Sequence, residues 1–355
     1  MICAIDFGSC RIRSVFRNPQ TPERLKMFSV RSDYTLLSST EQNRMTLEAL
    51  AVPYAECDQA LVVFGNQATS AQWLSRVPPT ALLVGGNVPS DDAPARQMLS
   101  LLTESMLPII HDAHSGSGAQ NLCVMTVPGL RDGSDQARKN EAFLYRLVQM
   151  QGYQPLVVNS AEATLLATCS DALFTGVNLV MGAETTTICI ARLGMLIASE
   201  TIGIGGNWID TELAKHFRVQ IFDEAGTAYL NIESIRHWKT ESGANLINSL
   251  GDRERMLMRL YTAVLDRVSR TLTQMLDSAQ VRLALSTQRL SVMLAGGAVM
   301  VDGFVNLLTE QFIQHGIADR ILSVRIAPDP ETAVIRGALI FGELESRVLK
   351  SEAAA

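Results

Sequence analysis

The sequence predicts an α/β protein with two related halves that face a shared ligand. One observation is that apolar, strand-like segments alternate with helix-like segments, an order that implies parallel βα units. Another is a repeated pattern of apolar strand, glycine turn with hydroxyl side chains, and second strand. It occurs at Ile2–Phe16 and again within Asn178–Ile202. Two similar hairpins far apart in one chain indicate two related halves, each contributing one turn to the ligand.

Length and composition narrow the class of protein further. A chain of 355 residues can bury a large core and is expected to hold two domains, because single cores stop growing near about 250–300 residues. The formal net charge of −6 argues against a general affinity for nucleic acid. No apolar run approaches the roughly 18 residues of a membrane helix, so no membrane anchor is expected. Six scattered cysteines favour a reducing, cytoplasmic compartment.

In the amino-terminal half, apolar strands alternate with capped helices. Ser134 is expected to cap a helix that runs through Gln151 and ends at Gly152. The elements expected in order are a hairpin over 2–16, small strands and loops over 31–67, a helix over 95–109, a buried strand over 122–128, the helix after Ser134, a strand over 156–159, and a helix from Ser160 to Ala172.

In the carboxy-terminal half, a β-branched run between glycine turns predicts a three-strand meander over 178–202. Met256, Leu260 and Val264 recur at four-residue intervals and predict one long helix over 252–285. The other expected elements are a helix from Gly205 to His216, a helix over 232–247, a buried strand from Leu290 that ends in Ala295-Gly-Gly-Ala298, a helix after it, and a terminal helix from Asp329.

The turns of the two hairpins have the composition of a phosphate-binding loop. Gly182 is followed by Ala-Glu-Thr-Thr-Thr, which offers backbone N–H groups unobstructed by large side chains together with three hydroxyls. The glycines after the buried strand at Leu290 would let the backbone lie flat against a ligand at the carboxyl end of that strand. These residues predict a phosphate-containing ligand between the halves.

Taken in order, these segments resemble the motifs of the actin-like ATPase superfamily, and most closely those of MreB-type bacterial actins and of the nucleotide-binding domain of DnaK-type chaperones. The resemblance covers nearly the whole chain. The segments that carry it are Asp6-Phe-Gly-Ser, Phe64-Gly-Asn-Gln-Ala, Val127-Pro-Gly with Arg138, Met181-Gly-Ala-Glu-Thr-Thr, Gly205-Gly-Asn-Trp-Ile-Asp, Trp238-Lys-Thr-Glu, Leu294-Ala-Gly-Gly-Ala with Gly303, and Asp329-Pro-Glu-Thr-Ala-Val with Gly337.

The resemblance implies a two-lobed actin-like ATPase fold, in which each lobe is a mixed sheet with flanking helices and the nucleotide cleft lies between the lobes. Lobe I is expected to comprise residues 1–31, 68–174 and 326–355, with a small subdomain inserted at 32–67. Lobe II is expected to comprise 175–208 and 286–325, with a second subdomain inserted at 209–285.

The resemblance also implies ATP or ADP with Mg²⁺ in the cleft. Asp6 would hold the metal through water, because Mg²⁺ keeps most of its hydration shell. Lys239 and Glu241 would reach the nucleoside, and the glycine loop would touch the adenosine. The expected nucleotide-binding residues are Asp6, Gly8, Ser9, Cys10, Arg13, Gly182, Ala183, Thr185, Thr186, Gly205, Gly206, Lys239, Glu241, Gly296, Gly297 and Ala298.

Two positions depart from the superfamily pattern. The second phosphate motif usually begins with Asp, and here Val180 stands there; the connecting segment usually carries Glu or Gln, and here Ser160 stands there. The missing groups are those that position the metal-bound and attacking water. Glu162 and Glu184 are the candidate substitutes as catalytic carboxylates. We therefore predict intact ATP binding with weak or lost hydrolysis.

The leading functional hypothesis is an ATP-binding, MreB-like cytoskeletal protein that self-associates into filaments in the cytoplasm. One alternative is a nucleotide-dependent scaffold, or a chaperone-like regulator without a substrate-binding domain, that does not polymerise. Another is a small-molecule kinase of the same superfamily, which would need a carboxylate base facing a substrate pocket, and the sequence offers no clear candidate for that base.

Overall fold

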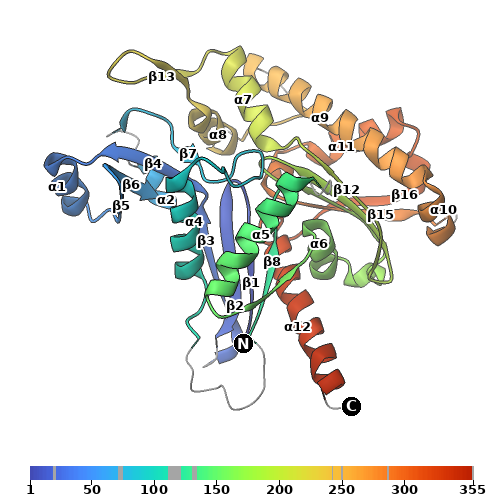
Figure 1. The fold of residues 1–355 in the computed structure, drawn as a ribbon. Helices are drawn as coiled ribbons and strands as arrows, with labels where there is room; N and C mark the ends of the chain where they lie inside the picture. Colours follow the sequence, from blue (N-terminus) through green and yellow to red (C-terminus); the bar gives the residue numbers. More distant parts are fainter. Residues whose placement is uncertain are drawn as a thin grey trace.

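Two five-stranded sheets of the same topology form the centre of the molecule (Figure 1). The computed structural model describes residues 1–18, 21–70, 75–110, 121–129, 134–241, 243–248, 251–285 and 288–353. In each sheet, three sequential antiparallel strands continue into two parallel strands. This arrangement confirms the two-lobed α/β fold and the two related halves.

The sheet of lobe I has the order β3-β2-β1-β8-β9. Its strands are β1 (Ile2–Phe7), β2 (Arg11–Asn18), β3 (Thr21–Arg31), β8 (Leu122–Thr126) and β9 (Gln154–Val157). All five residues of β8 are buried, as the apolar run predicted. Asp6 pairs in register with Arg13 on β2 and with Thr126 on β8, so three polar side chains meet at the carboxyl end of β1.

The sheet of lobe II has the order β12-β11-β10-β15-β16. Its strands are β10 (Gly176–Met181), β11 (Thr186–Arg192), β12 (Met195–Ile202), β15 (Leu290–Ala295) and β16 (Ile321–Ile326). The predicted meander is confirmed as β10, β11 and β12. The large apolar core of lobe II lies between this sheet and the long helix α9 (Asp252–Asp277), whose Leu257, Val264 and Leu272 are fully buried.

Two smaller sheets are inserted into the lobes. The first has the order β5-β6-β4-β7 and contains β4 (Asp33–Ser38), β5 (Ala55–Cys57), β6 (Ala60–Phe64) and β7 (Thr80–Ala81), with α1 (Glu41–Ala49) and α2 (Asn66–Ser70). The second pairs β13 (Gln220–Phe222) with β14 (Ala228–Leu230). Helix α1 was not predicted, because it buries only Leu47 and so lacks an apolar face. The proposed subdomain borders stay a prediction.

The remaining helices differ from the expected ones mainly at their ends. Ser134 caps its helix as predicted, but the long predicted helix breaks at Ser278, where the backbone turns extended and the hydroxyl donates to the Met275 carbonyl. The helix expected over 232–247 ends at Glu241. The observed helices are α4 (Ala93–Met106), α5 (Asp135–Met150), α6 (Ser160–Thr168), α7 (Gly206–His216), α8 (Ile232–Glu241), α10 (Ala279–Leu285), α11 (Phe304–Gln314) and α12 (Ala333–Ala353).

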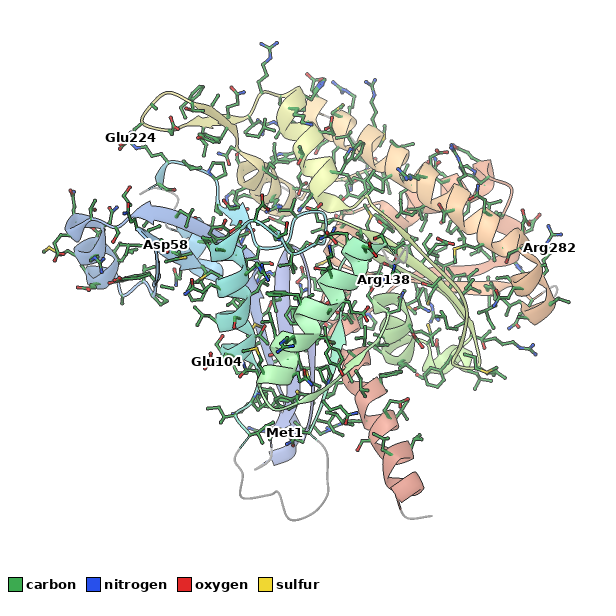
Figure 2. The ribbon with its side chains drawn as sticks, in the orientation of Figure 1. Met1, Asp58, Glu104, Arg138, Glu224 and Arg282 are labelled. Atoms are coloured by element: carbon green, nitrogen blue, oxygen red, sulfur yellow. The ribbon has the colours of Figure 1, made fainter. Side chains whose placement is uncertain are left out.

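Helices α6 and α12 join the lobes. They pack backbone to backbone, because a Cβ at Gly337 would lie 1.7 Å from the Ala163 carbonyl oxygen. Ala161 and Leu165 of α6 and Val334 of α12 share an apolar cluster with Val180 of the lobe II sheet. Labelled charged residues such as Asp58 and Arg282 lie at the outer edges of the molecule, away from this centre (Figure 2). Among the described residues, no helix is long and apolar enough to cross a membrane.

Candidate functional site

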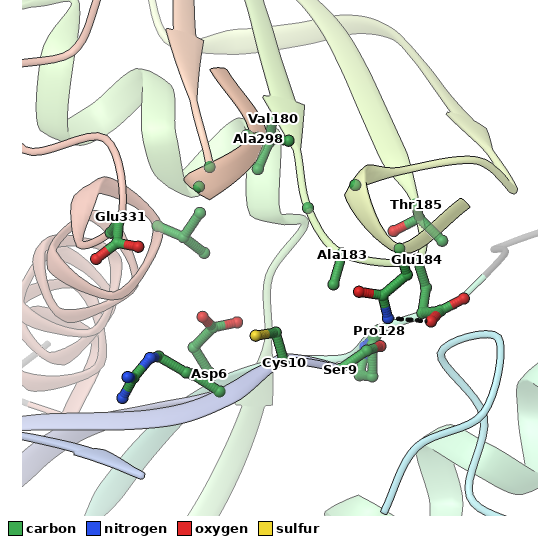
Figure 3. Close-up of a pocket in the computed structure, with 18 of the residues that line it drawn as sticks. Asp6, Ser9, Cys10, Pro128, Val180, Ala183, Glu184, Thr185, Ala298 and Glu331 are labelled. Carbon is green, nitrogen blue, oxygen red and sulfur yellow. Dashed lines mark hydrogen bonds between the residues drawn. The ribbon is translucent and has the colours of Figure 1, made fainter. Parts of the chain in front are cut away.

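A cleft of about 460 Å³ lies between the two sheets, and both hairpin turns line it (Figure 3). A volume of several hundred Å³ is typical of a small-molecule site. Of the predicted binding residues, those that line the cleft are Asp6, Gly8, Ser9, Cys10, Arg13, Gly182, Ala183, Thr185, Gly206, Lys239, Gly296, Gly297 and Ala298. Segments that are far apart in sequence therefore meet at one place.

The turn between β1 and β2, which we call turn I, is formed by Gly8, Ser9 and Cys10. A Cβ on Gly8 would lie 2.4 Å from the Arg11 carbonyl oxygen, so the turn closes too tightly for a side chain there. Within the described part of the chain, the N–H groups of these three residues donate no backbone hydrogen bond. Successive free amides of this kind make an anion-binding concavity.

Asp6 lies below turn I and is the carboxylate that would hold a metal through water. Its Oδ1 accepts a hydrogen bond from the Thr126 hydroxyl at 2.5 Å, and its Oδ2 lies 3.8 Å from Nη1 of Arg13. Burial raises the pKa of Asp6 above its usual value, and the charge of Arg13 and the Thr126 hydrogen bond only partly oppose this effect. Asp6 is therefore a buried carboxyl that would gain from a cationic partner.

The turn between β10 and β11, which we call turn II, comprises Gly182, Ala183, Glu184 and Thr185. The first amides of α7 support it from behind: Gly206 N–H donates to the Gly182 carbonyl at 2.9 Å and Asn207 N–H to the Ala183 carbonyl at 2.8 Å. Gly182 N–H closes the turn on the Thr185 carbonyl. The amides of Ala183, Glu184 and Thr185 have no backbone acceptor among the described residues, so turn II matches turn I as an anion site.

Two predicted nucleotide-binding residues, Thr186 and Gly205, lie behind turn II and do not line the cleft. The Thr186 side chain is fully buried, and its hydroxyl donates to the Ile204 carbonyl at 2.8 Å. Gly205 is needed for packing, because a Cβ there would lie 2.6 Å from the carbonyl oxygens of both Gly182 and Ala183. Both residues thus shape the turn, and neither lines the cleft.

The glycine loop after β15 contains one structural glycine and one that faces the ligand space. Gly296 has φ +94°, and a Cβ there would lie 2.2 Å from the Met181 carbonyl oxygen. Gly297 has room, since its nearest neighbour for a Cβ is the Glu331 carboxylate at 3.4 Å. Figure 3 shows Ala298 and Glu331 beside the same space as Asp6 and turn II.

Helix α8 supplies the polar wall where the nucleoside was expected. Lys239 lines the cleft, and its ammonium donates to Oδ1 of Asp210 at 2.5 Å. The side chain of Glu241 lies outside the described residues, so its predicted ribose contact stays a prediction.

The catalytic carboxylate candidates lie in different places. Glu162 does not line the cleft, whereas Ser160 does. A helix turns by about 100° per residue, so a side chain two positions beyond Ser160 points to the opposite side. Glu162 instead lies near Cys189, where burial and the Glu162 charge raise the pKa of the thiol. Glu184 lines the cleft, but its Oε1 accepts a hydrogen bond from Asn207 Nδ2 at 2.5 Å.

Several residues that line the cleft were not predicted from the sequence. Thr126 ends a buried strand beside Asp6, a position from which it could have been inferred. Arg31, Glu233 and Arg236 come from segments whose charge pattern is that of an ordinary exposed surface, and only the tertiary fold brings them to the cleft. No group of three or more potential metal ligands occurs in the described part of the chain.

Comparison with known proteins agrees with this geometry. The sequence model of the family described as Volactin matches residues 1–341. A search of curated proteins found no match. The solved structure of a MamK double helical filament has a TM-score of 0.68 and 18% identity, covering 96% of this chain and 98% of that chain.

Two further structures share the fold. MreB5 of Spiroplasma citri bound to AMPPNP has a TM-score of 0.66 and 14% identity, with coverages of 99% and 98%. The ethanolamine utilization protein EutJ from Carboxydothermus hydrogenoformans has a TM-score of 0.50 and 16% identity, with coverages of 96% and 89%. These similarities confirm the predicted actin-like fold.

Proposed function

The chain belongs to the Volactin family, and we propose that it is an ATP-binding, actin-like protein that assembles into filaments and hydrolyses ATP weakly or not at all. The observation that carries the nucleotide assignment is that two turns with free amides line one cleft from opposite sheets. Such an arrangement can hold a chain of phosphates between the two lobes. The crystal structures of MreB5 bound to AMPPNP and to ADP show that this fold accommodates such ligands in that protein.

The residues of the cleft fit a magnesium nucleotide. The amides of turns I and II would bind the phosphates, and Gly297 would let the adenosine approach the backbone. Asp6 and its neighbour Thr126 would hold the hydrated metal, which neutralises phosphate charge when bound. The hydroxyls of Thr187 and Thr201 lie 3.3 Å apart in the cleft wall and add polar groups near turn II.

Slow hydrolysis follows from the side chains at the two departing positions. Val180 lines the cleft, is 8% exposed and packs in an apolar cluster, so it cannot orient water. Ser160 lines the cleft with a short hydroxyl where a carboxylate was expected. Since positioned groups are each worth orders of magnitude in phosphoryl transfer, turnover is expected to be slow.

Self-assembly is supported by an exposed apolar patch at one end of lobe II, formed by Leu173, Leu193, Met195, Leu196 and Leu283. Their exposed fractions are 69%, 62%, 64%, 40% and 86%. Hydrogen bonds hold the segments together, for example from Leu193 N–H to the Thr175 hydroxyl and from Arg192 to the Ala284 carbonyl. Leu173 and Leu193 adopt left-handed backbone with φ of 50°, a strained conformation for leucine.

A second copy of the chain is the partner that we propose for this patch. When this patch binds a different surface of the next copy, the contact is head-to-tail, and head-to-tail contacts that do not close generate filaments. MamK, which shares the fold, has been solved as a double helical filament.

One experiment tests both parts of the proposal. Sedimentation of the wild type with ATP and Mg²⁺ is expected to show a critical concentration, and ATP is expected to raise the melting temperature. Met195→Glu should no longer sediment as filaments but should keep its ATP-induced stabilisation. Gly297→Val should lose both the ATP-induced stabilisation and the ATP-dependent assembly. Met150→Glu is the matched control, because Met150 is similarly exposed, at 68%, but lies on α5 of lobe I.

The outcomes separate the two assignments. Stabilisation at a hundredfold excess of ligand over Kd amounts to about 2.7 kcal/mol, which a melting experiment resolves. A wild type that ATP stabilises but that stays monomeric at high concentration would favour the non-polymerising scaffold. A folded Gly297→Val variant with unchanged ATP stabilisation would remove the adenosine assignment.

A further inference from the structure

A chain of ion pairs runs along the wall of the cleft from lobe I to the inserted subdomain of lobe II. Arg31, at the end of β3, binds Glu233 in a bidentate pair, with Nη1 at 2.8 Å from Oε1 and Nη2 at 2.9 Å from Oε2. The two residues are 202 positions apart in sequence. Both line the cleft.

Each end of this pair is held in place by its own lobe. Nε and Nη2 of Arg31 donate to Oδ2 of the buried Asp33 at 2.9 and 2.6 Å, and Arg31 N–H donates to Asn66 at 3.0 Å. On the other side, Arg236 donates from Nη1 to Oε2 of Glu233 at 3.2 Å. The forked geometry of an arginine–carboxylate pair is therefore fixed before the lobes meet.

The same chain continues to turn II. Arg236 donates from Nη2 to Oδ1 of Asn207 at 2.6 Å, and the amide nitrogen of Asn207 donates to Glu184 in turn II. Arg236 also lies 3.5 Å from the Asp210 carboxylate. An uninterrupted set of polar contacts thus joins the small subdomain of lobe I to the turn that faces the ligand.

The burial of its arginine distinguishes this pair from an ordinary surface ion pair. The side chains of Arg31 and Glu233 are 15% and 27% exposed, whereas Arg17 and Glu343, an arginine–glutamate pair within lobe I, are 48% and 25% exposed. Neighbouring arginines lower the pKa of Glu233 despite its partial burial, so the carboxylate is ionised at neutral pH. Separating the lobes must break two short charge-assisted hydrogen bonds at once.

We propose that Arg31 and Glu233 are positioning residues that clasp the two lobes over a bound nucleotide and set its rate of release. The proposal rests on the nucleotide binding proposed above. In this proposal a ligand between turns I and II leaves when the lobes separate, and separation exposes both charges to water. Water then partly compensates for the lost ion pair. Loss of the clasp is therefore expected to raise the rate of ligand release by about tenfold and not to abolish binding.

The test is the release of a pre-bound fluorescent ATP analogue from the full chain after a chase with excess ATP. Glu233→Gln keeps the shape of the side chain but removes its charge, and it is expected to release the analogue about tenfold faster, with a smaller change in the association rate. Arg31→Lys keeps the charge but loses the fork, so a smaller acceleration is expected. Glu343→Gln is the matched control, because it removes a pair that does not cross the cleft, and its release rate should equal that of the wild type.

Small-angle scattering of the ligand-free protein provides a second measurement. Loss of the clasp should let the lobes separate, so Glu233→Gln should have a larger radius of gyration than both the wild type and Glu343→Gln. If the wild type binds no nucleotide, the proposed function fails. The scattering result alone then shows whether the Arg31–Glu233 pair holds the lobes together. Wild-type release rates in Glu233→Gln, or an unchanged radius of gyration in ligand-free protein, would overturn the clasp.

Discussion

The two halves have equivalent positions around their turns, but one half has a polar side chain where the other has an apolar one. In lobe I, Asp6 stands two residues before Gly8 and pairs in register with Arg13 and Thr126. In lobe II, Val180 stands two residues before Gly182 and pairs with Thr187 and Ala295. The sheet topology is the same, yet the position in lobe I holds a hydrogen-bonded carboxyl group whereas the position in lobe II holds a valine in an apolar cluster.

This difference separates what the backbone supplies from what side chains supply. Among the described residues, the amides of both turns have no backbone acceptor, and such amides can bind an anion whatever the side chains are. Of these two equivalent positions, only the one in lobe I carries an ionisable side chain that could hold a metal. The proposed function therefore treats ligand binding and water activation as separate properties, the first carried by the backbone of the turns and the second by side chains.

The largest expected effect comes from making the two halves alike. Val180→Asp combined with Ser160→Glu should raise ATP turnover by roughly a hundredfold, because it restores two groups that position metal-bound and attacking water. The new glutamate would start α6, where the helix dipole favours negative charge. Phosphate release under saturating ATP measures the effect.

The neutral double variant Val180→Asn with Ser160→Gln is the control for this prediction, since it changes shape without adding charge. One other result would assign the catalytic role to a different carboxylate. If the unmodified protein already releases phosphate quickly, and Glu184→Ala or Glu162→Ala abolishes this activity, the carboxylate has moved rather than vanished.

An intermediate effect is expected from adding a methyl group to each turn. Gly8→Ala should lower the free energy of unfolding by about 2–3 kcal/mol, because its Cβ would lie 2.4 Å from a backbone oxygen that cannot move independently. Gly182→Ala meets the Thr185 carbonyl at 3.3 Å and should cost less than about 1 kcal/mol. Urea denaturation of ligand-free protein compares them, and a larger cost at Gly182 would show that turn II is the more constrained.

The smallest effect concerns the buried carboxyl group of Asp6, whose equivalent position in lobe II is Val180. The raised pKa of Asp6 means that the folded state binds its proton more tightly than the unfolded chain. This contribution to stability is complete below the unfolded pKa and is lost as the pH rises through the folded pKa. At pH 7, Asp6→Asn should therefore raise the melting temperature of ligand-free protein by about 2 °C.

At low pH the same substitution should have no effect on the melting temperature, since Asp6 is then protonated in both states. Asp58→Asn, at an exposed position on the small subdomain, should be neutral at either pH. A drop in the melting temperature of Asp6→Asn at pH 7 would indicate that the pair with Arg13 outweighs the cost of burial.

The sequence by itself determined the features that depend on local backbone chemistry. Glycine turns between apolar strands predicted both hairpins, because tight turns and free amides need small residues wherever they occur in a fold. The repeated hairpin predicted two related halves, the order of strands and helices predicted parallel βα units, and Ser134 marked the start of α5 through its cap. The apolar residue at Val180 was visible without coordinates, and the register of β10 later placed it in the cleft.

Only the tertiary structure decided where side chains point and which distant ones meet. Thr186 and Glu162 looked like ligand-facing groups in the sequence. The hydroxyl of Thr186 instead donates a hydrogen bond to the Ile204 carbonyl. The geometry of α6 places Glu162 on the side of the helix that faces away from the cleft. Arg31 and Glu233 carry no local signal, because the energy of an ion pair depends on distance and burial, and these exist only once the two lobes have packed together.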